Sequence, residues 1–207
     1  ACNFKCSYCG PQYSSKWVEE IKKHGAYPTS DNFGNLEWLK ENGKMPYKHS
    51  EPNPYVDAFW EWWPELYPSM DTFRITGGEP SMSPDFWKVV EHILTTDNPN
   101  MNLKLSINTN LGIPDKLYQR LKTKLVELEE SGRIKELTIF TSVDTFGTQA
   151  EYIRNGLEFD VWQERVDELL SSTKKLSIAI MSTFNALSVP KYADLVDWVF
   201  EQKTKHN

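Results

Sequence analysis

Three cysteines stand close together at the start of the chain, as Cys2, Cys6 and Cys9, and no other cysteine occurs in the sequence. Their spacing is C-x3-C-x2-C, and Tyr8 directly precedes the last of them. An odd, clustered set of cysteines does not suit a disulfide framework. Thiolates this close in sequence can instead converge on one metal centre in a reducing compartment.

The number of cysteines bears on which metal centre they can hold. A structural zinc site normally has four ligands, and none of the candidates for a fourth has an obvious zinc spacing: an acid, His24, His49, His92 or His206. A [4Fe–4S] cluster usually takes four cysteines as well. With three, one iron keeps an open coordination position, which is useful only if a substrate or cofactor binds there. The spacing alone thus leaves a cluster with an open iron and a zinc-binding module as the two possibilities.

A glycine-rich turn follows the first predicted strand, at 72–77. It reads Thr76-Gly77-Gly78-Glu79-Pro80. Two glycines let the backbone approach a ligand closely or take a positive φ, and the neighbouring carboxylate can accept hydrogen bonds from an ammonium group. The motif alone is not specific for ligand binding, because an ordinary strand-to-helix turn with a capping acid can have the same sequence.

Polar side chains also stand at the ends of the later predicted strands. Ser142 and Asp144 share a face by the strand period of two, and the guanidinium of Arg154 suits a carboxylate. The alternatives are a polar strand end for Asn108 and Asn110, and an ion pair with a nearby acid for Arg154.

Hydrophobic periodicity predicts alternating strands and helices. Strands are expected at 72–77, 103–109, 136–143 and 176–183, and helices at 15–24, 36–41, 55–66, from Pro84, at 114–131, 160–171 and 190–203. Alternation of this kind indicates strand–helix units and a parallel sheet. Each strand has one apolar and one polar face, which favours a curved sheet around a polar cavity over a flat sheet buried on both sides. Ligands of such α/β folds bind at the carboxyl ends of the strands.

The cysteine spacing, the place of Tyr8 and the Gly77-Gly78-Glu79-Pro80 turn after the next strand together resemble the radical S-adenosylmethionine (SAM) superfamily. In that family the open iron of a [4Fe–4S] cluster is chelated by the amine and carboxylate of SAM, and the GGE(P) motif binds the amine. Residues 108–110 resemble the T-N segment of the family. Ser142 and Asp144 resemble its S-x-D segment, which faces the ribose or the methionyl carboxylate, and Arg154 resembles its Y-x-R-x-G segment. The resemblance therefore implies cluster ligands and cofactor-binding residues as follows: Cys2, Cys6 and Cys9 on the cluster, and Tyr8, Gly77, Gly78, Glu79, Pro80, Asn108, Asn110, Ser142, Asp144 and Arg154 around SAM.

The resemblance covers nearly the whole chain and implies a fold. The family has a partial (β/α)6 barrel whose cysteine loop follows strand one, so the predicted strands correspond to strands two to five. We therefore expect residues 1–207 to be a fragment of one core domain, lacking strands one and six, with an irregular, aromatic-rich insert at about 25–54.

The implied activity is radical chemistry of an oxidoreductase or transferase type. A reduced cluster passes an electron to the sulfonium of SAM, and the resulting 5′-deoxyadenosyl radical abstracts hydrogen from a substrate. An external electron donor, similar to flavodoxin or ferredoxin, is implied. The S-x-D and Arg154 patterns are similar to members with SPASM or twitch extensions, which commonly modify peptides or proteins. Alternatives are a small-molecule radical enzyme, a glycyl-radical activase, or a non-catalytic iron–sulfur or zinc-binding module.

Composition excludes several other classes. The net charge is −6, and basic residues never form a run longer than a pair, so a nucleic-acid partner is not expected. No apolar run approaches the ~20 residues of a membrane span, and no signal peptide is visible; we expect a cytoplasmic protein. The Trp-rich segment 59–63 is predicted to pack against the sheet, and the acidic residues Glu127, Glu129 and Glu130 to form a solvated helix face.

Overall fold

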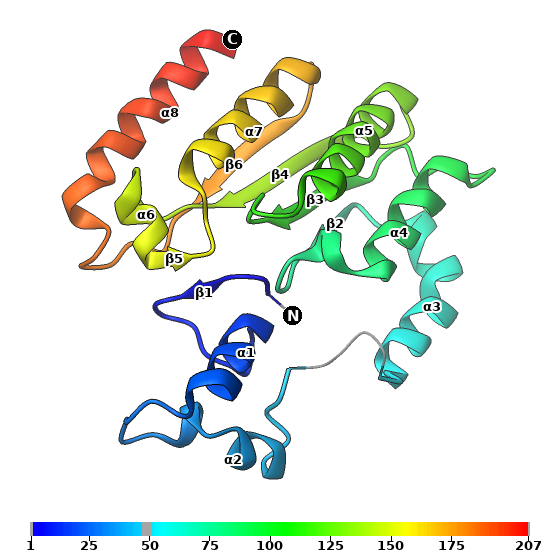
Figure 1. Ribbon diagram of the computed structural model, residues 1–207. Helices are drawn as coiled ribbons and strands as arrows, with labels where there is room; N and C mark the ends of the chain where they lie inside the picture. Colours follow the sequence, from blue (N-terminus) through cyan, green and yellow to red (C-terminus); the bar gives the residue numbers. More distant parts are fainter. Residues whose placement is uncertain (1, 47–50, 207) are drawn as a thin grey trace.

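A parallel sheet forms the centre of the molecule, as the computed structural model shows for residues 2–46 and 51–206 (Figure 1). Within these residues it has four strands in the order β2-β3-β4-β6. Ile75, Ile107, Ile139 and Ile178 stand side by side across it. The strands are β2 (Thr72–Ile75), β3 (Lys104–Thr109), β4 (Glu136–Ser142) and β6 (Ser177–Met181).

Helices follow the strands and cover the apolar face of the sheet. Figure 1 shows α5 (Asp115–Ser131) and α7 (Phe159–Ser172) lying across this face, and α4 (Pro84–Thr95) and α8 (Tyr192–His206) pack against α5 and α7. The predicted apolar positions of the central strands are buried beneath them: Leu105, Ile107, Leu137 and Ile139. The α/β class, the four parallel strands and the two-faced pattern are thus confirmed, and closure into a (β/α)6 barrel stays a prediction.

The opposite face of the sheet carries polar side chains, as expected. The Arg74 side chain crosses to β3, where its Nε donates to Asn108 Oδ1 at 2.9 Å. Its guanidinium also lies over the Phe140 ring, 4.0 Å from the ring centroid. The side chains on this face are less buried than those on the apolar face, because none of the helices named above covers it.

The first quarter of the chain contains two helices, α1 (Ser15–His24) and α2 (Leu36–Glu41), close to their predicted positions. Between residues 25 and 53 the described part contains only α2 and the 3-10 turn η1 (Asn32–Gly34), so this insert is irregular as predicted. Residues 47–50, including His49, lie outside the described residues.

The helix α3 (Pro54–Leu66) presents the Trp-rich segment to the sheet. Trp63 is buried, and its ring lies 5.4 Å from Phe73 on β2 and 5.3 Å from Tyr67 in the following 3-10 turn η2 (Tyr67–Ser69). Packing of this segment against the sheet is therefore confirmed, although Trp62 on the outer face is exposed.

Several short elements have no counterpart in the predictions. The helix α6 (Thr148–Ile153) leads into β5 (Arg154–Asn155), which pairs antiparallel with β1 (Lys5–Cys6). The 3-10 turns η3 (Pro80–Met82) and η4 (Val189–Lys191) precede α4 and α8. Elements this short show no periodicity in the sequence. They matter here because β5 brings Arg154 opposite Cys6.

One prediction about the surface is wrong. Glu129 does not belong to a purely solvated face, because its carboxylate accepts hydrogen bonds from the backbone N–H groups of Lys174, Lys175 and Leu176 at 2.7 to 2.8 Å. It thereby fastens the end of α5 to the start of β6. Among the described residues, no helix has the length and apolar character needed to cross a bilayer.

Candidate functional site

A cavity of about 460 Å³ lies where the carboxyl ends of the central strands meet the cysteine loop. This volume falls in the range of small-molecule sites, roughly 300–1,000 Å³. Its walls come from the cysteine loop, the glycine turn after β2, the ends of β3 and β4, β5 and the segment after β6. The lining residues are Cys2, Phe4, Cys6, Tyr8, Cys9, Tyr13, Gly77, Gly78, Asn108, Thr109, Asn110, Ser142, Arg154 and Thr183.

The cysteine loop is fastened to the start of α1. Ser14 is the N-cap of this helix, and its hydroxyl accepts a hydrogen bond from the Trp17 N–H. Its hydroxyl also donates to the Phe4 carbonyl at 2.5 Å, and the indole N–H of Trp17 donates to the Cys6 carbonyl at 3.3 Å. An N-cap that also binds the loop ties the positions of the cysteines to a helix.

The three cysteine side chains border the same cavity and influence one another. Burial raises the pKa of the Cys6 thiol to about 11, and the neighbouring Cys2 and Cys9 add to this effect. Burial also raises the pKa of Cys9. Iron or zinc binds thiolates, so a metal centre would have to displace the protons of Cys6 and Cys9 against this shift.

A single metal ion and a cluster place different requirements on the three cysteines. In the described part of the chain, no three His, Cys, Asp or Glu side chains come close enough to ligate one metal ion. A cluster is larger, and its cysteines surround it rather than meet at one point. Three thiols that border one cavity are compatible with that requirement.

The glycine turn forms one wall and buries its carboxylate. Gly77 has a φ of +140°, which L-residues rarely adopt. Glu79 is only 3% exposed and does not line the cavity. It accepts hydrogen bonds from the hydroxyl and N–H of Ser81, the Thr109 hydroxyl and the Asn110 N–H. Burial raises the pKa of this carboxyl although these donors oppose the shift, so a cationic group nearby would favour its ionised form.

On the opposite wall, Asp144 and Arg154 form a buried ion pair. The guanidinium binds both carboxylate oxygens of Asp144, at 2.8 and 2.9 Å. Asp144 is fully buried and also accepts from the Tyr8 hydroxyl and the Thr183 N–H, each at 2.8 Å. Arg154 remains in the cavity lining, whereas Asp144 lies behind it. The pair joins the cysteine loop to β5 and to the segments after β4 and β6.

The structure therefore brings most of the predicted site residues to one cavity. Ten of them line it, namely Cys2, Cys6, Cys9, Tyr8, Gly77, Gly78, Asn108, Asn110, Ser142 and Arg154. Glu79, Pro80 and Asp144 lie outside this lining and are buried. Sequence reasoning missed Phe4 and Tyr13, which also line the cavity, although both stand within or just after the cysteine motif.

No protein-family model and no curated protein matches the sequence. The fold is similar to that of SuiB from Streptococcus suis. The crystal structure of SuiB bound to its precursor peptide SuiA has a TM-score of 0.50 and 18% identity, over 98% of this chain and 35% of that chain. SuiB bound to S-adenosylmethionine gives a TM-score of 0.48 and 19% identity, over 98% and 34%. This chain thus spans about a third of the length of SuiB, and at this identity the similarity to the SuiA-bound structure shows a shared fold.

Proposed function

We propose that this chain is the core of a radical SAM enzyme. The observation that carries the proposal is the convergence of Cys2, Cys6 and Cys9 on one cavity that the Gly77-Gly78 turn and Arg154 also line. A [4Fe–4S] cluster on the three cysteines would have one iron open toward that cavity. The shared fold with SuiB is consistent with this proposal and supports it at the level of architecture.

Different residues of the chain would hold the cluster and SAM. Cys2, Cys6 and Cys9 would supply three thiolates, and the Gly77-Gly78 backbone with the Glu79 carboxylate beneath it would receive the SAM amine. When bound, the cluster and SAM together supply a 5′-deoxyadenosyl radical by one-electron cleavage of the sulfonium, with electrons from an external donor. The protein orients both groups and shields them from water.

The polar residues on the other walls would address the rest of SAM. Asn108, Asn110 and Ser142 present amides and a hydroxyl to the cavity, which suits a ribose or a carboxylate. Arg154 lines the cavity as a cation but already binds Asp144. A ligand carboxylate would therefore share the guanidinium with Asp144 rather than replace it.

We further propose a peptide as the substrate class. SuiB, whose fold is similar, has been crystallised with its precursor peptide SuiA. A place among relatives with SPASM or twitch extensions is a finer proposal, based on Ser142, Asp144 and Arg154 alone.

The test is anaerobic reconstitution with iron and sulfide, followed by dithionite and SAM and detection of 5′-deoxyadenosine. We expect the wild-type chain and the control Ser172→Ala, an exposed site on α7, to give the product, and Cys6→Ala to give neither cluster absorbance nor product. Full cluster content in Cys6→Ala would refute the assignment. In the same assay, a peptide fraction from the source cells should stimulate turnover and lose this effect after protease treatment; stimulation by the small-molecule fraction alone would contradict the peptide proposal.

A further inference from the structure

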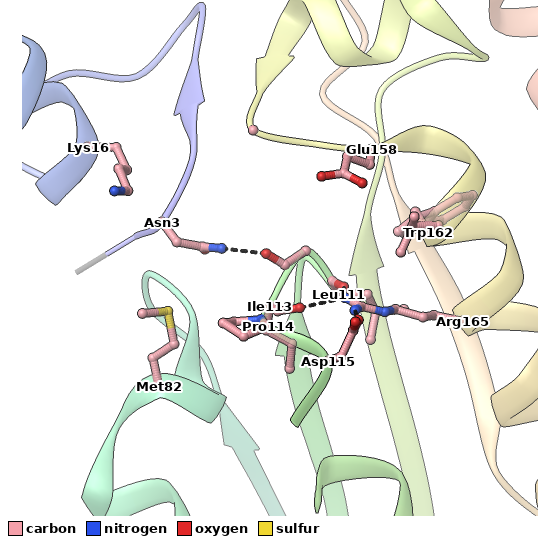
Figure 2. A pocket seen from close by; sticks show the side chains of 13 residues that line it. Asn3, Lys16, Met82, Leu111, Ile113, Pro114, Asp115, Glu158, Trp162 and Arg165 are labelled. Carbon is pink, nitrogen blue, oxygen red and sulfur yellow. Dashed lines mark hydrogen bonds and ion pairs between the residues drawn. The ribbon is translucent and has the colours of Figure 1, made fainter. Parts of the chain in front are cut away.

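The residue after Cys2 is bound to the loop that follows β3. The side-chain Nδ2 of Asn3 donates to the Gly112 backbone carbonyl at 2.8 Å, and the side-chain Nδ2 of Asn110 donates to Asn3 Oδ1 at 2.7 Å. Figure 2, which looks into a second cavity of about 620 Å³, shows Asn3 pointing at this loop. Because both ends of the Asn3 amide are engaged, the side chain is held in one orientation.

The next residue, Phe4, is packed against two glycines from distant parts of the chain. Its ring is 2% exposed. A methyl group added at Gly112 would lie 2.1 Å from Phe4 Cζ, and one added at Gly156 would lie 2.8 Å from Phe4 Cδ1. Both distances are shorter than real carbon contacts allow, so Phe4 occupies a slot that exists because both positions are glycine. We call the space between Gly112 and Gly156 the phenylalanine slot.

The wall of the slot is itself held in place from α7. Arg165 is 6% exposed, and its guanidinium donates to the carbonyls of Leu111 and Ile113, at 2.5 and 2.7 Å, and to the Asp115 carboxylate at 2.5 Å (Figure 2). Two carbonyls that flank Gly112 are therefore fixed by one buried cation. The Gly112 side of the slot is thus held by contacts with α7, which lies outside the cysteine loop.

We propose that Phe4 is a positioning residue for the cysteine loop, and that seating it in the phenylalanine slot sets the separation of Cys2 and Cys6 before any iron arrives. Phe4 stands between these two cysteines, and its carbonyl is held by Ser14. Ligands fixed in advance bind a metal centre at a lower entropic cost than ligands on a free loop. The role in cluster assembly rests on the function proposed above, whereas the docking of the loop does not.

The variant Gly112→Ala tests this inference in the full chain. Gly112 does not have a positive φ, unlike Gly156, so the new methyl acts mainly on the Phe4 ring. We expect the new methyl group to displace the cysteine loop from the slot. Alkylation of Cys6 in the iron-free chain should then be roughly 5- to 150-fold faster, a range that corresponds to the free-energy cost of overpacking a buried site. Cluster absorbance after reconstitution should fall in parallel.

A size swap separates positioning from general damage. Phe4→Leu removes the two ring atoms nearest the new methyl, Cζ and Cε1, so Gly112→Ala combined with Phe4→Leu should regain slow alkylation and most of the cluster absorbance. Leu128→Ala, in the buried face of α5, is the control that loses stability without touching the loop, and it should keep both signals.

The outcomes are distinct. Unchanged alkylation of Cys6 in Gly112→Ala, or failure of Phe4→Leu to rescue it, overturns the docking of Phe4. Fast alkylation together with normal cluster assembly in Gly112→Ala overturns the positioning role. A wild-type chain that forms no cluster overturns the proposed function and the role in assembly with it, while the alkylation rates still decide whether Phe4 docks the loop.

Discussion

At the scale of single residues, the ion pair between Asp144 and Arg154 should be the most sensitive polar contact of the site. Asp144→Asn leaves a guanidinium buried without its counter-charge, which typically costs about 3–5 kcal/mol. Asp194→Asn, in the exposed pair with Lys191, should cost no more than about 1 kcal/mol. Urea unfolding of the two iron-free variants measures the difference. Equal losses would mean that the buried pair contributes no more than a surface pair does.

Asp144 also shows which features of the site could not be predicted from the sequence. The period of two placed Ser142 and Asp144 on one strand face, and both indeed lie at the end of β4. Asp144 is nevertheless turned away from the cavity lining, because the chain returns through α6 and brings Arg154 back to it. Glu79 is similar, since two of its hydrogen-bond donors are distant in sequence, namely Thr109 at the end of β3 and Asn110 directly after it. Contacts between distant segments leave no local signal in a single sequence.

At the scale of elements, hydrophobic periodicity predicted the helices well. Ser14 and Ser83 precede α1 and α4, and Gly132 ends α5 with a left-handed φ of +65°. The paired strands β1 and β5 could not be predicted, because two residues carry no periodicity and their pairing depends on the tertiary fold. The same holds for Phe4, whose slot needs glycines from two separate loops.

The contact between α5 and β6 provides the test at this scale. Glu129→Ala removes the charged acceptor of three backbone N–H groups, and a hydrogen bond to a charged group typically contributes about 1.5–3 kcal/mol. Glu130→Ala, an exposed neighbour on the same helix, should change stability by less than about 0.5 kcal/mol. Thermal unfolding of both variants checks this. A Glu130 variant as unstable as the Glu129 variant would show that helix propensity, not the bridge to β6, is responsible.

At the scale of the whole molecule, the cysteine loop is attached to the sheet through several segments, so a metal centre in it should stabilise the entire fold. Ligands that bind only the folded state raise its stability by mass action, about 2.7 kcal/mol at a hundredfold excess over the dissociation constant. We expect reconstitution with iron and sulfide to raise the melting temperature of the wild-type chain and of Ser172→Ala. Cys2→Ser should abolish the shift, and iron chelation should reverse it. An unchanged melting temperature despite full iron content would show that the loop is energetically separate from the sheet.

The ladder between β1 and β5 has a consequence for how the two ligands of the proposed enzyme would influence each other. Cys6 and Arg154 face one another in that ladder, so we expect a displacement of one backbone to displace the other. The binding of an anion at Arg154 and the binding of a metal at Cys6 would then be linked by one coupling free energy. By reciprocity, whatever factor the metal adds to the retention of the anion, the anion adds to the retention of the metal.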